Sequence, residues 1–336
     1  MPFSNLPDVD RGEDMDGKSA LILGATGGVG GAIAGAMLAD GWSVRGLVRD
    51  VRTAEHAWPR HRGAMTWVAG DAMRSEDVLK AAMGVSVVVH AVNPPGYRHW
   101  DRLVLPMIDN SIAAARATGG ARIVLPGTVY NFDPAVTPLV SEQSAQMPRN
   151  RKGRVRVEME ARLEAAAKTG VPSLIVRAGD FFGADARSSW FTQVMVPAGK
   201  PFHRIVNPVA RAGVGHSWAY LPDLAEVIVR LVGMKDDLRP FERLQFEGLW
   251  DADGTALPAA IRRVTQRPDL PVTRFSWWAM TLLAPFGGMP REIAEIAPYL
   301  RHPMRFDNRR LVELLGEEPR TQIDDALRAT LRLGMP

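Results

Sequence analysis

The 336-residue chain is predicted to be an α/β protein with a doubly wound parallel sheet and a smaller, mostly helical C-terminal lobe. Three observations predict this fold. Short apolar runs rich in Val, Ile and Leu alternate with helical stretches over the first half of the chain. A glycine-rich turn follows the first of these runs. After about residue 185 the alternation stops, and Trp and Pro become frequent among short helical segments.

The apolar runs are the expected strands of the sheet, and in order they read SALILG, WSVRGLV, AMTWVAG, VSVVVHAV, ARIVLPG and PSLIVRAG. Strands that are apolar throughout are typical of a parallel sheet covered by helices on both faces. Segments such as PDLAEVIVRLV, REIAEIAPYL and NRRLVELLG favour a lobe that closes over the carboxyl ends of the strands. We expect a flexible segment over residues 1–17, a nucleotide-binding domain over 18–185 and the lobe over 186–336, from which about 205–235 return to the first domain.

Composition excludes several classes of protein. Hydrophobic residues at 46% and charged residues at 23% are typical of an ordinary globular domain. The net charge of +4 is small and dispersed, which argues against a nucleic-acid partner. The chain has no cysteine, so disulfides, cysteine nucleophiles and thiolate metal sites are excluded. No clustered His, Asp and Glu set indicates a metal, and none is expected.

Neither a secretory leader nor a membrane span is predicted. The first 17 residues are acidic and lack an apolar stretch. The longest strongly apolar run, residues 277–289, is far shorter than the ~20 residues that a span requires, and Pro285 interrupts it. We therefore expect a cytoplasmic protein with a small-molecule substrate and no membrane partner.

The glycine-rich turn predicts a dinucleotide site. In SALILGATGGVGGAIAGAML a strand is followed by Gly24, Gly27 and Gly30 and then by a helix. Glycines let the backbone approach a pyrophosphate, whose charge is attracted to the positive N-terminus of the helix. An ordinary tight turn is the alternative. The residues expected to contact the cofactor here are Gly24, Thr26, Gly27, Gly28, Val29 and Gly30.

The end of the second strand favours NADP (NADPH) over NAD. Arg49 stands where an NAD site needs an acidic residue, with Arg45 before it and Arg52 after it. A guanidinium forms charge-assisted bonds with a ribose 2′-phosphate. Alternatively, Arg49 is a solvated residue and Asp50 binds the ribose. Asp71, after the third strand, is expected to accept a bond from the adenine amino group, or else to be a turn residue.

Together these residues resemble the short-chain dehydrogenase/reductase superfamily in its extended or atypical branch, which includes NAD-dependent epimerases and dehydratases. The resemblance covers roughly residues 18–235 and rests on GATGGVG, GDAMR, VVVHAV, VLPGTVYN, VRAGDFFG and WAYLPDLAEVI. It implies a Rossmann fold and an NAD(P) cofactor. It also implies cofactor contacts after the third, fourth and sixth strands, at Ala72, Ala91, Val92 and Ala178. Members of this superfamily often pair through helices beside the active site, which is compatible with a homodimer.

The catalytic set of the superfamily is incomplete in this chain. The set consists of a Ser or Thr after the fifth strand, a Tyr, and a Lys four residues after the Tyr. Thr128 matches the hydroxyl member, whereas Lys152 stands at the position of the Tyr and Arg156 at that of the Lys. No Tyr-x-x-x-Lys exists, because the tyrosines are Tyr97, Tyr130, Tyr220 and Tyr299.

Two proton donors are therefore considered. Lys152 is one, with Arg156 holding the cofactor ribose, and the alternative is that both are solvated helix charges. Tyr130, just after the fifth strand, is the other, and the alternative is an aromatic residue that lines the pocket without moving a proton.

The loops after the strands supply the expected substrate contacts, whose aromatic members are equally compatible with a core. They are Asn93, Tyr97, Asn131, Phe181, Phe182 and Trp190. The function favoured by the sequence is an NADP-dependent oxidoreductase or epimerase/dehydratase-like enzyme that acts on a small carbonyl or hydroxyl compound. A sugar nucleotide is disfavoured because no second diphosphate site is evident, but the arginines of the C-terminal lobe leave this substrate class open. The alternative function is an inactive sensor that binds NADP(H).

Overall fold

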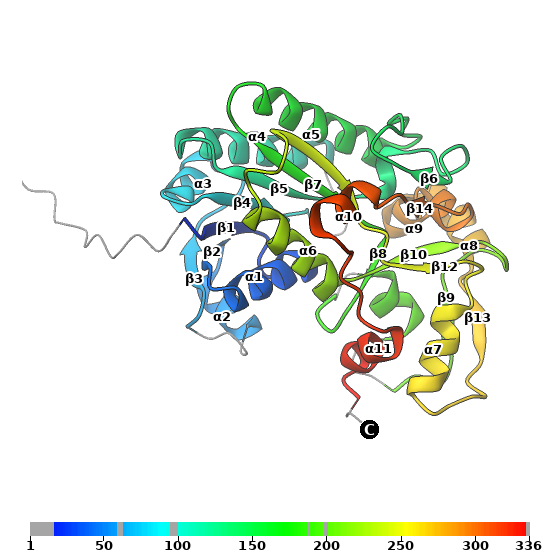
Figure 1. Ribbon diagram of the computed structural model, residues 1–336. Helices are drawn as coiled ribbons and strands as arrows, with labels where there is room; N and C mark the ends of the chain where they lie inside the picture. The colour runs from blue at the N-terminus through cyan, green and yellow to red at the C-terminus, as the bar shows by residue number, and fades with distance from the viewer. Residues whose placement is uncertain (1–16, 59–62, 95–99, 187–188, 198–200, 334–336) are drawn as a thin grey trace, which may run out of the picture.

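The computed structural model describes residues 17–58, 63–94, 100–186, 189–197 and 201–333. Across these residues, a parallel seven-stranded sheet runs in the order β11-β7-β5-β4-β1-β2-β3 (Figure 1). The strands are β1 (Ser19–Leu23), β2 (Ser43–Val48), β3 (Thr66–Ala69), β4 (Val87–His90), β5 (Arg122–Gly127), β7 (Ser173–Arg177) and β11 (Phe241–Gln245). The doubly wound prediction is confirmed, and the first six of these strands are the six predicted apolar runs.

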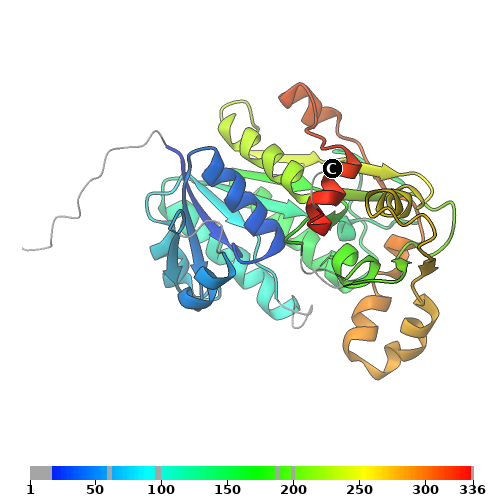
Figure 2. The ribbon, with the colours of Figure 1, turned by 90° about the horizontal axis from the view of Figure 1, so that it is seen from below.

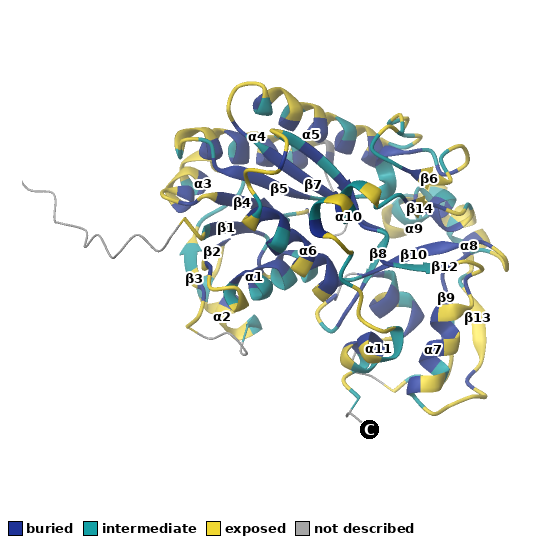
Figure 3. Cartoon of the chain, in the orientation of Figure 1, coloured by how far each residue is buried: buried dark blue, intermediate teal, exposed yellow. Residues whose placement is uncertain are grey.

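Helices cover both faces of the sheet (Figures 1 and 3). One face packs against α3 (Ser75–Ala82), α4 (Trp100–Ala117) and α5 (Arg151–Ala167), and the other against α1 (Gly28–Ala39), α6 (Leu221–Gly233) and α10 (Arg309–Leu315). The short α2 (Val51–Ala57) lies beside β3. Successive residues of β1 point to opposite faces, so Leu21 and Leu23 join the first core and Ile22 the second. Burial on both faces explains why the strands are apolar throughout.

The rest of the chain forms a lobe of short helices and small sheets. Within the described residues the sheets are β12-β10-β8, β13-β9 and β14-β6. Their strands are β6 (Leu139–Val140), β8 (Asp180–Phe182), β9 (Ile205–Asn207), β10 (His216–Tyr220), β12 (Leu249–Asp251), β13 (Val272–Arg274) and β14 (Arg305–Phe306). The longer helices are α7 (Ala256–Val264), α8 (Trp277–Leu283), α9 (Gly288–Ala294) and α11 (Ile323–Leu331). Single turns are η3 (Val129–Asn131), η4 (Phe191–Met195), η5 (Ala284–Phe286) and η6 (Ala297–Leu300).

The lobe differs from the prediction in two respects. It contains small sheets as well as helices. Most of their strands have only two or three residues, which is too short for a period in the sequence to be detected. The segment that returns to the main sheet is also longer than the expected 205–235, since β11 and α10 lie beyond it. The predicted flexible segment lies outside the described residues except at Gly17. None of the helices in the described ranges is both long and apolar enough to cross a membrane.

A buried ion pair joins the end of β7 to α5. Arg177 Nη2 donates to the two carboxylate oxygens of Glu160 at 2.9 and 3.0 Å, and the side chains are 1% and 5% exposed. Arg177 Nη1 also donates to the carbonyl oxygen of Thr128 at 2.7 Å. A charge-assisted pair in which one guanidinium nitrogen meets both carboxylate oxygens, with an additional backbone acceptor for the other, compensates the cost of burying both charges. The pair therefore connects β7, α5 and the turn after β5.

The same carboxylate organises η3. Asn131 Nδ2 donates to Glu160 Oε1 at 2.8 Å and to Gln146 Oε1 at 2.9 Å. Gln146 Nε2 donates to Glu160 Oε2 at 2.6 Å. The guanidinium of Arg177 lies 4.9 Å from the centre of the Phe132 ring. The turn between β5 and the lobe is thus fixed by one buried network of polar side chains, which contacts it at Thr128, Asn131 and Phe132.

We predict that Glu160→Ala lowers the free energy of unfolding by about 3 to 5 kcal/mol, because it leaves Arg177 buried without a counter-charge. Glu158→Ala is the matched control on the same helix. Glu158 is half-exposed and pairs with Arg162 at 2.9 Å, so its loss is expected to cost about 1 kcal/mol or less. Urea unfolding of both variants checks the difference, and equal losses would contradict a structural role for the buried pair.

Candidate functional site

The loops that carry the predicted site lie side by side at the carboxyl edge of the sheet. In the strand register Leu23 lies beside His90, and Gly127 lies beside Arg177. Since β7, β5, β4 and β1 are consecutive neighbours, the loops that follow them line one edge. This edge is where open parallel sheets bind ligands. The loops begin at Ala178, Thr128, Ala91 and Gly24.

The turn after β1 is shaped for a pyrophosphate. Gly24 has a φ of +91°, and a Cβ placed on it would lie 2.6 Å from the carbonyl oxygen of Ala91. A Cβ on Gly30 would lie 2.3 Å from the carbonyl oxygen of Gly24. In α1, all of whose residues are described, no side chain caps the N-terminus and the first turn carries no acidic residue. The exposed Thr26 and Gly27 and the half-buried Gly28 and Val29 complete a cradle that fits an anion.

At the end of β2, Arg49 and Asp50 have different surroundings. Arg49 is exposed. Asp50 instead caps α2, because its carboxylate accepts from Thr53 N at 3.2 Å and from Thr53 Oγ1 at 2.8 Å. These hydrogen bonds lower the pKa of Asp50. Arg45 donates to two backbone carbonyl oxygens at the end of α3, at 2.5 and 3.3 Å, and is turned away from this edge.

The loop after β3 shows the turn geometry that was the alternative reading of Asp71. Asp71 Oδ1 accepts from Met73 N at 2.9 Å, and Asp71 N donates to Asp77 Oδ2 at 2.9 Å. The carbonyl oxygen of Ala72 accepts from Asn110 Nδ2 at 2.9 Å. Contacts of Asp71 and Ala72 with an adenine stay predictions.

Arg156 reaches the end of β4 from α5. Its Nη2 lies 3.5 Å from Asn93 Oδ1, and its guanidinium lies 5.1 Å from the centre of the Trp100 ring. Ala91 and Val92 are half-buried beside this loop. Only 8% of Arg156 is exposed, so the reading of this residue as a solvated helix charge is wrong. Its position between α5 and β4 is compatible with a contact to a bound cofactor.

A buried histidine, His90, stands near Arg156. His90 is buried, and its Nδ1 lies 2.8 Å from Ser111 Oγ. Burial and, secondarily, the charge of Arg156 lower the pKa of His90 to about 3. The imidazole is therefore neutral at physiological pH and packs as part of the core.

Lys152 faces the lobe. It is fully buried. Its Nζ lies 2.6 Å from Oε2 of Glu292, which is on α9, and 2.5 Å from Oε2 of Glu295, which directly follows α9. Burial raises the pKa of Glu295, but the hydrogen bond and charge of Lys152 and the backbone N–H of Arg151 together bring it below the usual value. The solvated reading is wrong for Lys152 too, because the residue joins α5 to the lobe.

Around η3, Thr128 and Tyr130 are both half-buried. Thr128 Oγ1 accepts from Tyr130 N at 3.4 Å. The Tyr130 ring lies 5.2 Å from that of Tyr299, whose hydroxyl donates to the carbonyl oxygens of Tyr130 and Phe132 at 3.1 Å each. Burial raises the pKa of Tyr299, which favours this donor role. Asn131 is fully buried in the Glu160 network, an arrangement that does not favour its predicted contact with a substrate.

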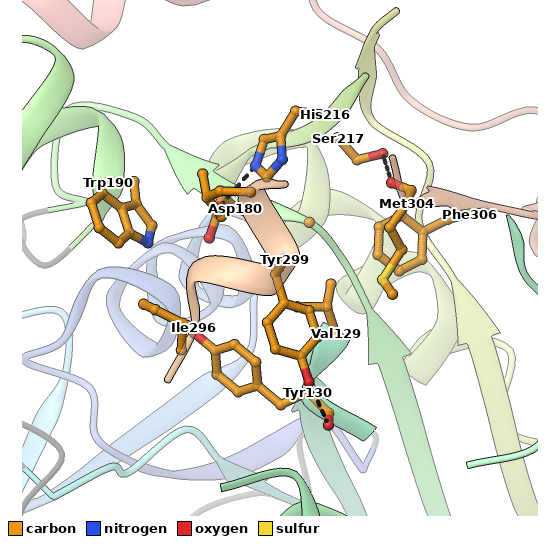
Figure 4. Close-up of a pocket in the computed structure, with 12 residues that line it drawn as sticks. Val129, Tyr130, Asp180, Trp190, His216, Ser217, Ile296, Tyr299, Met304 and Phe306 are labelled. Atoms are coloured by element: carbon orange, nitrogen blue, oxygen red, sulfur yellow. Dashed lines mark hydrogen bonds and ion pairs between the residues drawn. The ribbon is translucent and has the colours of Figure 1, made fainter. Parts of the chain in front are cut away.

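A small cavity lies between η3, β8, β10 and η6 (Figure 4). Its volume of ≈ 20 Å³ is enough for about one water molecule. His216 Nε2 lies 2.8 Å from Asp180 Oδ2 on its wall. Sequence reasoning missed His216 and Tyr299, since a single histidine in a short strand and a lone tyrosine in a helical lobe have no characteristic spacing. The other lining residues include Tyr130, Trp190, Ile296 and Leu300.

The aromatic residues expected at the substrate site divide between cavity and core. Trp190 lines the cavity. Phe181 is half-buried against the α1 and α6 core. Phe182 is 2% exposed and packs on Phe191 and Tyr220, so the structure corrects it to a core residue. Ala178 is likewise buried, and Tyr97 lies outside the described residues. No group of three or more His, Asp and Glu side chains that could hold a metal is found in the described ranges.

The chain is similar to known proteins in sequence and in fold. A family model described as NAD(P)H-binding matches residues 24–216. Among solved structures, UDP-glucuronic acid 4-epimerase from Bacillus cereus in complex with NAD is 14% identical with a TM-score of 0.72, over 94% of this chain and 96% of that one. UDP-N-acetylglucosamine 4-epimerase from Bacillus cereus gives 14% identity and 0.69 over the same shares.

A curated relative, 3-diazoavenalumate denitrifying reductase from Streptomyces sp, is 30% identical over 135 residues. The match covers 37% of this chain and 42% of the relative, so the chain matches less than half the length of that protein.

Identities this low between folds of the same architecture show the fold alone. The family model, however, spans more than half of the 336 residues and includes the cradle, β4, β5 and β7. The chain belongs to the NAD(P)H-binding family, with the Rossmann fold of the extended short-chain dehydrogenase/reductases that its sequence resembles.

Proposed function

We propose that this protein is an NADP-dependent oxidoreductase or epimerase/dehydratase-like enzyme that acts on a small carbonyl or hydroxyl compound. The supporting observation is that Arg156 meets Asn93 on the same edge of the sheet as the Gly24–Gly30 cradle. The group suited to a pyrophosphate thus follows β1, and Arg156 of α5, the group suited to a ribose, meets the loop after the neighbouring strand β4. When bound, the nicotinamide would accept or donate a hydride.

Different residues of the chain would bind different parts of such a cofactor. Backbone N–H groups at the start of α1 would bind the pyrophosphate, and the Arg156 guanidinium would donate to ribose hydroxyls. Arg49 would bind the ribose 2′-phosphate, because it is exposed while Asp50 is committed to capping α2. The remaining contacts would come from Asp71, Ala72, Ala91, Val92 and Ala178.

Tyr130 is the proton donor that the geometry favours. It lines the cavity from η3 and follows Thr128, which would orient the substrate oxygen. The ammonium of Lys152, by contrast, is within 2.6 Å of two half-buried carboxylates, so a proton lost from it would remove their closest counter-charge. We assign Lys152 to holding α9 in place.

The lining of the cavity supports a partly apolar substrate. Trp190, Ile296 and Leu300 on its wall are apolar, and because the cavity has room for only about one water molecule, a substrate would have to displace some of these side chains. The His216–Asp180 pair, beside Trp190 in Figure 4, would bind a substrate hydroxyl. These residues support a substrate with an apolar part and a hydroxyl or carbonyl group.

The second candidate is a sensor that binds NADP(H) without turnover. It is favoured by one observation, that the residue at the position of the superfamily's tyrosine is ion-paired with the lobe and fully buried. The sensor and the enzyme differ in whether any compound drives oxidation of bound NADPH.

We predict that Arg49→Ala weakens NADPH binding by roughly 10- to 100-fold, because a charge-assisted bond to the 2′-phosphate is worth about 1.5 to 3 kcal/mol. NADH binding should hardly change. Fluorescence titration of both nucleotides checks this, with Arg116→Ala, an exposed arginine in the last turn of α4, as the matched control. Tighter NADH binding by the unaltered protein would overturn the assignment of NADP.

We predict that Tyr130→Phe lowers substrate-dependent NADPH oxidation by about 10²- to 10⁴-fold and leaves NADPH affinity unchanged, since it removes one proton donor. The measurement is single-wavelength NADPH consumption across a panel of aldehydes, ketones and hydroxy compounds. If Tyr130→Phe keeps full turnover, Tyr130 only lines the pocket. If the unaltered protein binds NADPH stoichiometrically yet oxidises it with none of the compounds, the sensor is the correct function.

We predict that Lys152→Ala destabilises the protein at neutral pH by about 3 kcal/mol, because Glu292 and Glu295 lose their buried counter-charge. Arg154→Ala, an exposed change on the same helix, is the control. Since the folded pKa of Glu295 is lowered, this stabilisation is present above its ordinary value of 4.5 and disappears as the pH falls through the lower folded value. Urea unfolding at neutral and acidic pH checks both points, and a loss independent of pH would contradict them.

A further inference from the structure

Residues 275–290 form an apolar hairpin that the proposed enzyme does not use. Their sequence, FSWWAMTLLAPFGGMP, contains no charged residue. It builds α8, η5 and the start of α9, which pack against each other and project from the body of the molecule (Figure 2). The large apolar side chains exposed on this hairpin, with their exposed fractions, are Trp278 (72%), Leu282 (66%), Leu283 (43%), Phe286 (87%) and Met289 (55%).

One side of the apolar hairpin is anchored, and the other is open. Trp277 is 5% exposed, donates from Nε1 to the carbonyl oxygen of Pro208 at 2.8 Å, and packs on Trp190 at a ring distance of 5.4 Å. Phe286 and Trp278, in contrast, are the two most exposed large hydrophobic side chains in the described part of the chain. A contiguous apolar surface of this kind usually marks a binding site for a protein or a membrane.

The exposed charges that flank the apolar hairpin are basic. Arg274 precedes it and Arg291 follows it, and both are exposed. Arg274 donates to the backbone carbonyl oxygen of Val209 at 3.3 Å. The acidic residues of the same region, Glu292 and Glu295, are paired with Lys152. The hairpin therefore presents apolar side chains between two positive charges.

We propose that the apolar hairpin docks this protein on the surface of an anionic lipid bilayer. Trp and Phe side chains partition to the boundary between head groups and acyl chains, and arginines bind lipid phosphates. The helices α8 and α9 have seven residues each, about 10 Å of helix, so they lie in the interface and do not cross a hydrocarbon core of ~30 Å. The sequence alone indicated no membrane partner, because a run this short fails the test for a span.

Charge distinguishes the bilayer from a second copy of the chain as the occupant. A symmetric contact between two hairpins would bring Arg274 and Arg291 of both copies to one interface, and like charges there cost affinity. Anionic head groups remove this cost. Trp277 of the hairpin packs on Trp190, which lines the cavity, so docking brings the cavity close to the bilayer. The docking proposal does not rest on the proposed enzymatic function.

The test is co-sedimentation of the full chain with vesicles of phosphatidylcholine alone and of phosphatidylcholine mixed with phosphatidylglycerol. We expect binding to the anionic vesicles, reduced about tenfold or more by Phe286→Ser, since one buried aromatic side chain is lost. Arg274→Gln and Arg291→Gln should each reduce it about fivefold. The control is Met147→Ser, another exposed apolar residue, which should bind like the unaltered protein.

Because Trp278 and Phe286 are exposed, the variants are expected to fold, which circular dichroism checks. Vesicle binding should also shift the tryptophan emission to the blue, and Trp278→Phe should reduce the shift. The proposal is overturned if the unaltered protein does not bind anionic vesicles, or if Phe286→Ser and Met147→Ser bind alike. It is also overturned if the protein forms dimers that Phe286→Ser dissociates while vesicles bind neither form, because the hairpin would then cover a second copy.

Discussion

The site depends on the buried pair between Arg177 and Glu160. Its two charges come from β7 and α5, and both act on η3, through the Thr128 carbonyl oxygen and the Asn131 amide. A turn that leaves the sheet has few backbone partners of its own, so a compensated ion pair beneath it defines where the next side chains stand. Thr128 and Tyr130 are therefore placed by a network that never contacts the cavity.

The helix α5 carries two further buried charges besides Glu160, and each of them also joins α5 to another element. Lys152, Arg156 and Glu160 recur every four residues and share one face, and all three are buried. Each has a partner on a different element: Lys152 on α9, Arg156 on the loop after β4, and Glu160 on β7. A face that looks polar in sequence thus joins the lobe, the cofactor edge and the sheet. This arrangement explains how the helix tolerates two cations four residues apart, since each is compensated by separate neighbours.

The lobe has one surface that encloses a cavity and another that exposes large apolar side chains. Toward the sheet it closes a small cavity with Tyr299, Ile296 and Trp190, and Lys152 secures that wall. On its far side the same chain segment exposes Trp278 and Phe286. A helix of seven residues can bury one face only, and in this lobe Trp277 occupies that face. The remaining apolar side chains are then left for a partner outside the fold.

The sequence by itself determined six of the seven strands of the main sheet and the glycine cradle. Six apolar runs became β1 to β5 and β7, and the glycines at 24 and 30 stand where a Cβ would collide with backbone, because local period and glycine spacing are properties of consecutive residues. Tertiary structure decided what those residues face. It turned Asp50 into a cap, buried Asn131 and Phe182, paired Lys152 with α9 and joined His216 to Asp180 across 36 residues. Such contacts connect elements distant along the chain, and no local spacing encodes which distant partner a charged or aromatic side chain meets.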